Sequence, residues 1–237
     1  MMKYIISLLL GLLCGVALFI IALLNNPFIA DRTLSPLSDG DTAVTSLSYT
    51  AVPAKSIAFT NSGEARLQPH PKGIRLLREG TVELTDVMVT EMRDARGQTA
   101  GIGVKFSSRS ERTNLLRGEA LVDSVWYVHL PGRGSLFVEQ SENYWQFIRN
   151  VLVPAYRNSA NSWKGTWFGD LSAGPGALGV ARATGVGGSL LGQSMAAVES
   201  LSVQAYSTDK GLVSAEGRLL IGSPSAEPPS DDVAATD

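Results

Sequence analysis

The segment that decides the fold class is residues 119–130, EALVDSVWYVHL. In an extended chain, successive side chains point to opposite faces. One face of this segment then carries Val122, Ser124, Trp126, Val128 and Leu130. The other face is also largely apolar, with Leu121, Val125 and Tyr127. Two apolar faces predict a central β-strand that is covered on both sides.

Several other segments rich in β-branched or aromatic residues predict strands around this one. They are residues 43–52, 55–60, 80–92, 101–106, 135–140, 199–206 and 212–221. Among them, residues 101–106 alternate cleanly, with Ile102, Val104 and Phe106 on one face. The last two segments form the clearest hairpin, because Gly211 can supply the positive φ of a type I turn with a bulge.

A single short amphipathic helix is predicted at about residues 141–153. Its apolar residues recur at i, i+3, i+4, i+7 and i+8, which places them on one stripe. They are Tyr144, Phe147, Ile148, Val151 and Leu152. Ser141 is the expected N-cap, and Pro154 is expected to end or kink the helix. Trp145 lies about 100° from the stripe, so its ring is expected to be the more exposed one.

Many short strands with one helix predict a mainly β fold. The spacing fits a β-sandwich or a partly open β-barrel, and an elongated jelly roll is the third alternative. The expected organisation is a cytoplasmic N-terminus at 1–3, a transmembrane anchor at 4–24, a linker at 25–43, an exported β-rich domain at 44–221 and a disordered acidic tail at 222–237. The exported part has no cysteine, so it depends on its own core and not on disulfides.

The N-terminal segment 4–24 has 21 residues without a charge. A helix of that length spans roughly 30 Å, the thickness of the hydrocarbon core of a bilayer. Phe28 and Ala30 make a poor signal-peptidase site, so an uncleaved anchor is favoured over a cleaved signal sequence. Lys3 before the helix places the N-terminus in the cytoplasm and residues 25–237 in the periplasm or outside the cell.

Most chemistry-bearing motifs have a plain structural interpretation. The two histidines and the single cysteine, which lies in the anchor, argue against a metal site, and no cofactor is predicted. Residues 192–196 resemble a nucleophile elbow, yet no histidine follows Ser194. Residues 174–179 match a dinucleotide-binding glycine pattern, but Pro175 removes a backbone N–H from it. The net charge of −2 and the exported location disfavour nucleic acid.

Aromatic residues supply the candidate ligand-binding surface. The candidates are Trp126, Trp145, Trp163, Trp167 and His129. If residues 163–167 are extended, the two tryptophans in this segment share a face with Gly165. Such a pair forms either the edge of a core or an aromatic platform for a lipid chain, a glycan or a peptide.

The anchor carries a second candidate surface. Ser7, Gly11 and Gly15 recur every four residues, so they lie on one helix face. Small residues at this spacing let two membrane helices approach closely. The pattern predicts association through the anchor, for example in a homodimer.

These features predict a membrane-anchored envelope protein that is not an enzyme and that binds a partner protein or an amphiphilic ligand through its β-domain. One alternative is an envelope hydrolase of a glycan or lipid that uses acids near the aromatic cluster, namely Asp123, Glu139, Glu142 and Asp170. Another is a structural subunit of a membrane complex. The layout resembles that of envelope assembly and lipid-transport components, which is a likeness of architecture alone.

Overall fold

The computed structural model describes residues 2–24, 42–52, 85–172 and 181–224. The predicted strand at 55–60 and the glycine pattern at 174–179 lie outside these residues. So do most of the predicted linker and almost all of the predicted acidic tail.

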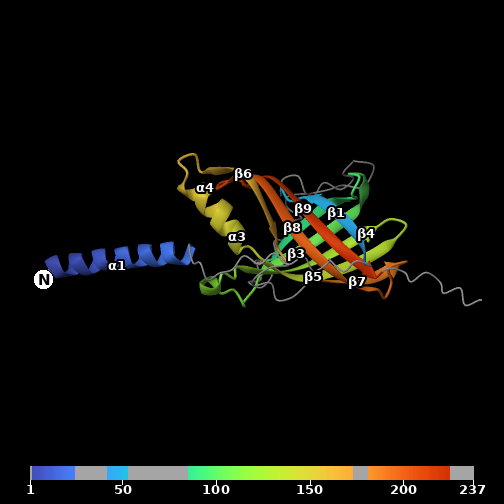
Figure 1. Cartoon of the computed structure of the whole chain (residues 1–237), viewed down its shortest axis with the longest axis horizontal. Helices are drawn as coiled ribbons and strands as arrows, with labels where there is room; N and C mark the ends of the chain where they lie inside the picture. The colour runs from blue at the N-terminus through green and yellow to red at the C-terminus, as the bar shows by residue number, and fades with distance from the viewer. Residues whose placement is uncertain (1, 25–41, 53–84, 173–180, 225–237) are drawn as a thin grey trace, which may run out of the picture.

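The N-terminal segment forms the helix α1, Met2–Leu24 (Figure 1). Its sequence places apolar residues around the whole circumference. An 18-residue window between Lys3 and Leu24 has a mean hydropathy of 2.9, and none of this window is buried against other described residues. Its length and composition suffice to cross a membrane. An N-terminal signal sequence has the same properties, so the helix agrees with an anchor or a signal sequence.

The predicted mainly β fold is confirmed, because nine antiparallel strands build the rest of the described chain. They are β1 (Thr42–Thr50), β2 (Thr85–Arg93), β3 (Thr99–Arg109), β4 (Leu121–Leu130), β5 (Gly134–Asn143), β6 (Ser162–Asp170), β7 (Ala181–Gly188), β8 (Ser194–Ser207) and β9 (Gly211–Pro224). A short 3₁₀ turn, η3 (Leu115–Arg117), precedes β4. The predicted central strand at 119–130 is β4, which lies between β3 and β5. The prediction that both of its faces are covered is wrong, because Val125 on the outward face is exposed.

Hydrogen bonding runs around a ring in the order β8–β7–β5–β4–β3–β2–β1–β9 and back to β8. The long strand β8 makes this closure possible. Its first residues pair with β7, as in Ala181↔Ala197, and its later residues pair with β6, as in Asp170↔Ser200. Its other edge pairs with β9 along most of its length. Of the predicted alternatives, this ring agrees with the barrel (Figure 1).

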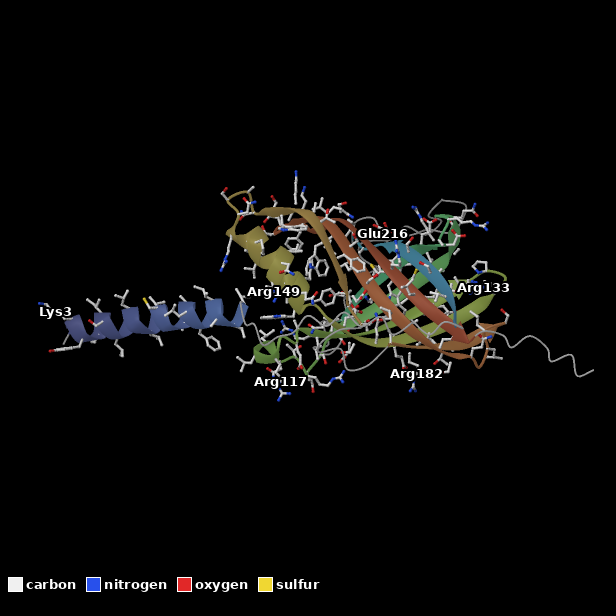
Figure 2. The ribbon with its side chains drawn as sticks, in the orientation of Figure 1. Lys3, Arg117, Arg133, Arg149, Arg182 and Glu216 are labelled. Atoms are coloured by element: carbon white, nitrogen blue, oxygen red, sulfur yellow. The ribbon has the colours of Figure 1, made fainter. Side chains whose placement is uncertain are left out.

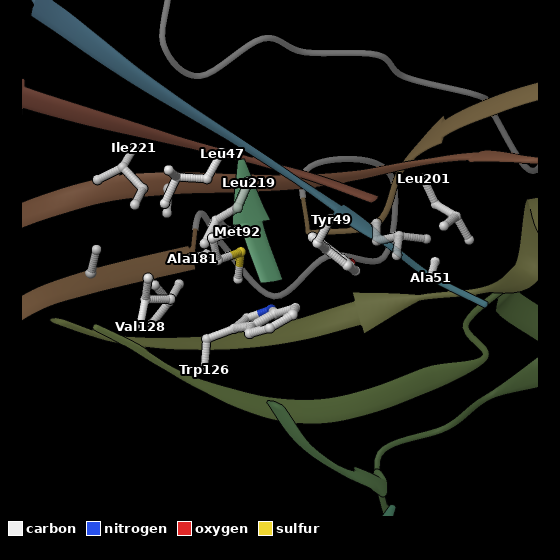
Figure 3. Packing of buried hydrophobic residues seen from close by; sticks show 14 of the residues in the cluster. Leu47, Tyr49, Ala51, Met92, Trp126, Val128, Ala181, Leu201, Leu219 and Ile221 are labelled. Carbon is white, nitrogen blue, oxygen red and sulfur yellow. The ribbon is translucent and has the colours of Figure 1, made fainter. Parts of the chain in front are cut away.

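Buried apolar side chains fill much of the interior of the ring (Figure 3). Trp126 and Val128 from β4 meet Leu47 and Tyr49 from β1, and all four are at most 4% exposed. Charged side chains such as Arg133, Arg182 and Glu216 project from the outside (Figure 2). The inward and outward positions therefore alternate along each strand, as the pleat of a sheet requires.

Strand β3 turns its apolar face outward. Phe106 is 46% exposed, whereas Gly103 and Lys105 point inward. The reason is volume, because a Cβ on Gly103 would lie 2.9 Å from the ring of Trp126. The space that a larger inward residue would need is already occupied by that ring.

The predicted helix is present at one end of the barrel and is built in three parts (Figure 1). They are α3 (Trp145–Phe147), a π-helical turn η4 (Ile148–Leu152) and α4 (Val153–Arg157). It begins after the predicted N-cap, because Ser141 is still part of β5 and pairs with Asp123. Pro154 does not end it, because the π turn stops at Leu152 and Pro154 lies in the first turn of α4, where a proline is tolerated. The expectation that Trp145 is the exposed ring is wrong, because Trp145 is 4% exposed.

Candidate functional site

Lys105 lies inside the barrel, on the inward face of β3, and is 6% exposed. Its Nζ atom is 2.7 Å from a carboxylate oxygen of Glu142 and 2.7 Å from one of Glu199. The ammonium also lies 5.3 Å from the ring centroid of Trp126, where a cation is attracted by the face of the indole. Lys105 thus bridges β5 and β8 across the interior.

Glu199 is fully buried, and its carboxylate accepts contacts from four side chains. Oε1 receives the hydroxyl of Tyr49 and the ammonium of Lys105. Oε2 receives Nε1 of Trp126 at 2.8 Å and the side-chain amide of Gln140. A buried carboxylate is tolerated when donors surround it in this way.

Glu142 is the second fully buried carboxylate of the cluster. Its Oε1 accepts from Lys105, from the hydroxyl of Ser124 and from Nε2 of Gln140 at 3.0 Å. Its Oε2 accepts from the hydroxyl of Tyr144 at 2.6 Å. Gln140 therefore joins the two carboxylates, and every contact that they make is with a donor.

Charge holds this cluster together. Burial alone would lower the pKa of Lys105, but the neighbouring carboxylates of Glu142 and Glu199 raise it above its ordinary value. Burial would raise the pKa of Glu199. The charge of Lys105 and the hydrogen bonds from Lys105 and Tyr49 outweigh burial and lower that pKa. Two carboxylates and one ammonium leave a formal local charge of −1.

A cavity of about 620 Å³ adjoins the cluster at the helix end of the barrel. Most of its wall is apolar, including Met88, Phe147, Leu171, Leu201 and Leu212. The polar part of its wall includes Lys105, Ser107, Asp86 and the two tyrosines that donate to the carboxylates, Tyr49 and Tyr144.

The cavity lies beside the two neighbouring strands of the ring that share the fewest paired residues, β1 and β2. Among the described residues, β1 and β2 pair only at Ser48↔Arg93, near one end of each strand. The consecutive residues 86–89 of β2 all line the cavity. Consecutive side chains point to opposite faces, so the edge of β2 and not one face forms this wall.

The tryptophans predicted as ligand-binding residues pack into the body of the protein. Trp126 stands edge-on to Tyr49 with ring centroids 4.8 Å apart, and Trp167 does the same with Phe147 at 5.5 Å. Trp145 is buried and Trp163 is partly buried over Gly165. None of the four is among the described residues that line the 620 Å³ cavity.

His129, the fifth predicted ligand-binding residue, lies on the outward face of β4 and is exposed. Its Nδ1 is 2.9 Å from the hydroxyl of Ser135. It does not line the cavity near Lys105.

Two of the four acids named for hydrolysis meet on the outside of the barrel. Asp123 and Glu139 line one open hollow of about 330 Å³ together with Phe106 and Val125. Asp123 is 2.8 Å from a guanidinium nitrogen of Arg112. Burial raises the pKa of Asp123, but the polar groups around this carboxylate, including the guanidinium of Arg112, outweigh it and lower that pKa.

The other two acids lie elsewhere. Glu142 belongs to the buried cluster, and Asp170 ends β6, where partial burial raises its pKa. The small residues of the anchor, Ser7, Gly11 and Gly15, are in α1 as expected. A Cβ added at either glycine would meet no described atom within 4 Å, so this face is open in the monomer.

Sequence reasoning missed the buried cluster, although a signal for it exists. Glu199 is the lone charge on the inward stripe of β8, between Ala197 and Leu201. Lys105 gives no such signal, because its inward neighbours on β3 are Gly103 and Ser107. A lone charge on the apolar stripe of a strand, as at Glu199, is the pattern that could have indicated a buried ionic group.

Comparison of the chain with models of known protein families gave no match, and comparison with curated proteins gave none either.

Proposed function

We propose that this is a membrane-anchored binding protein, not an enzyme, that holds one amphiphilic molecule in the cavity of its barrel. The observation that carries this proposal is a cavity whose wall is mostly apolar but which ends at the buried ammonium of Lys105. An amphiphile has the same two parts, an apolar chain and a polar group.

The size of the cavity supports this assignment. Small-molecule sites usually enclose about 300–1,000 Å³ and combine apolar walls with a few polar groups. The cavity of about 620 Å³ lies within that range. A ring of about eight strands also has an interior just wide enough to hold one small ligand.

The N-terminal helix supports a site of action at a membrane. In the proposal it stays uncleaved, with its N-terminus in the cytoplasm and the barrel in the periplasm or outside the cell. The tether then keeps the cavity within reach of membrane lipids, from which an amphiphile can be taken up or to which it can be delivered.

A filled cavity tests the proposal. Leu212 lines the cavity near the start of β9. Leu212→Trp should therefore weaken the binding of a fluorescent fatty-chain probe at least about tenfold. The full chain in lipid nanodiscs is the material, and empty nanodiscs control for partition of the probe. Val213→Trp is the matched control, because Val213 is the next residue and is 41% exposed. Equal probe binding by both variants and the parent would refute the proposal.

A second candidate function is hydrolysis of a glycosidic bond at the outer hollow, because Asp123 and Glu139 both line it. Val125 pairs with Glu139 and Asp123 pairs with Ser141, so the two acids are diagonal neighbours on the sheet. The backbones of such neighbours are about 7–8 Å apart. Their side chains can therefore bring the carboxyl groups to the spacing of roughly 6.5–9.5 Å that an inverting pair needs. Asp123→Asn and Glu139→Gln should then each abolish glycan cleavage, and intact cleavage in both variants would exclude the hollow as an active site.

A further inference from the structure

We infer that the polar group of the bound amphiphile is uncharged, and that its hydroxyl, amide or ester oxygen accepts a hydrogen bond from Lys105. This inference rests on the proposed function, since it names the class of ligand that the same cavity takes. It follows from counting the hydrogen bonds and the charges at the polar end of the cavity.

The two carboxylates have little hydrogen-bonding capacity left for a ligand. Glu142 and Glu199 each accept contacts from four donors. Both side chains are fully buried, and neither lines the cavity. A ligand therefore meets the residues in front of them.

Those residues are Lys105, Tyr49 and Tyr144, which all line the cavity. An ammonium has three N–H donors, and the contacts of Lys105 with described carboxylates account for two. Each tyrosine donates its proton to a carboxylate, and its oxygen can still accept a hydrogen bond. One available N–H beside two accepting hydroxyl oxygens fits a hydroxyl or an amide, which can both accept and donate.

An anionic group fits this site less well. It would be attracted by the ammonium of Lys105, but two carboxylates lie 2.7 Å behind that same nitrogen and repel it. The cluster already carries a net charge of −1, so a carboxylate would lose its hydration without a balancing attraction.

A cationic group fits less well for a different reason. Lys105 lines the cavity whereas neither carboxylate does, so a second cation would meet a like charge first. Asp86 also lines the cavity, but it is exposed, and solvent screens its attraction. An uncharged polar group avoids both penalties.

A series of ligands with one chain and different polar groups tests the inference. The probes are tetradecanol, tetradecanamide, tetradecanoate and tetradecylamine, each competing with a fluorescent fatty-chain reporter for the full chain in nanodiscs. At about pH 8 the acid is ionised and the amine is protonated. We expect the alcohol and the amide to bind at least about tenfold more tightly than either charged ligand, after correction for partition into empty nanodiscs.

A charge-neutralising variant sharpens the test. Glu142→Gln changes the formal charge of the cluster from −1 to zero, so the affinity for tetradecanoate relative to tetradecanol should rise at least about tenfold. Glu216→Gln is the matched control, because it makes the same chemical change at an exposed, outward position on β9. Its preference should equal that of the parent protein.

The outcomes separate the inference from the function on which it rests. A preference of the parent protein for the alcohol and the amide supports the inference, even if Glu142→Gln fails to fold. Binding of tetradecanoate or tetradecylamine as tight as that of the alcohol overturns the inference and leaves a ligand-binding barrel. Binding of none of the four probes removes the proposed function itself.

Discussion

At the scale of single residues, glycines decide how the interior is filled. Tyr49 on β1 lies directly opposite Gly217 on β9, and a Cβ on Gly217 would be 2.0 Å from Cζ of the tyrosine ring. The absence of a side chain at Gly217 lets Tyr49 stand against Trp126 and reach Glu199. The cavity and the ion cluster therefore depend on a residue that touches neither carboxylate.

Gly217→Ala should lower the free energy of unfolding by about 1–3 kcal/mol, the usual cost of overpacking a core. The ring of Tyr49 is rigid and buried, so it cannot move aside cheaply. Chemical denaturation followed by tryptophan fluorescence measures the loss. Gly187→Ala is the control, since its Cβ would lie 3.8 Å from the nearest atom and should change the stability little. Equal stability of the two variants would contradict this packing.

The ionisable groups of the cluster predict how stability changes with pH. The pKa of Glu199 is lowered from 4.5, so its contribution is present above that value and is lost as pH falls through the folded-state pKa. The pKa of Lys105 is raised from 10.5, so its contribution is present below that value and is lost as pH rises through the folded-state pKa.

The tyrosines act in the same direction as Lys105. Burial, with the nearby Glu199 or Glu142 carboxylate, raises the pKa of Tyr49 and Tyr144 well above 10.0. The unfolded chain therefore loses protons first as pH rises through this range, and stability falls. Melting temperatures should be highest between about pH 4.5 and 10 and should decline on both sides. A melting temperature that keeps rising above pH 10.5 would contradict a buried, protonated Lys105.

Only some of the inward-facing side chains could be predicted from the sequence. The inward position of Trp126 and Val128 could be predicted from the alternation on β4. The inward position of Lys105 could not be predicted, because the apolar stripe of β3 that contains Phe106 faces outward. Which face of a strand is inside depends on the volumes of residues distant in sequence, here Trp126 and Met92 against Gly103.

At the scale of elements, the hairpin of β8 and β9 is the one that the sequence predicts most clearly. Ser207 pairs with Gly211, which has the predicted positive φ, +71°. The signal was local, since one glycine between two alternating runs specifies the turn. The hairpin also carries Glu199 on one strand and the cavity residue Leu212 on the other.

Gly211→Ala should destabilise the protein by about 1–2 kcal/mol, the cost of a left-handed conformation for a residue with a Cβ. No described atom lies within 4 Å of that Cβ, so the cost is purely conformational. Gly211→Asn should recover part of the loss, because asparagine tolerates this region. Lys210→Ala, at the neighbouring exposed position, is the control for urea unfolding. Full stability of Gly211→Ala would contradict this turn geometry.

The start of the helix and the strand in the glycine-rich segment were harder to predict from the sequence. The apolar stripe located the helix, but its start was misplaced because the end of β5 is polar like an N-cap. No sequence pattern indicated β7, whose residues Ala181–Gly188 contain three glycines. Gly185 is required there, since a Cβ would lie 1.6 Å from the carbonyl oxygen of Leu190. Glycines that permit close backbone approach look the same in sequence as glycines in a turn.

At the scale of the whole molecule, closure of the ring could not be read from the sequence. The pairs between β1 and β9 that close the ring run from Thr42↔Pro224 to Thr50↔Glu216. No local pattern specifies partners so far apart, so the sandwich and the barrel remained equal alternatives. The long β8 is the feature that makes closure possible, because it is shared by β7, β6 and β9.

The location of the whole molecule depends on α1. The full chain should remain with the membrane after alkaline extraction, because α1 is apolar over a length that spans a bilayer. Protease added from the outer side should digest the barrel and leave the N-terminus protected. Recovery of a soluble mature chain that begins after residue 24 would identify α1 as a cleaved signal sequence. Protection of the barrel would reverse the predicted orientation.

The most direct test is native mass spectrometry of the full chain extracted from its own membranes in lipid nanodiscs. We predict one bound amphiphile per chain, retained by the parent protein and by Val213→Trp and lost from Leu212→Trp. A parent protein that carries no such molecule, or a Leu212→Trp variant that retains it equally well, would contradict a ligand-holding barrel.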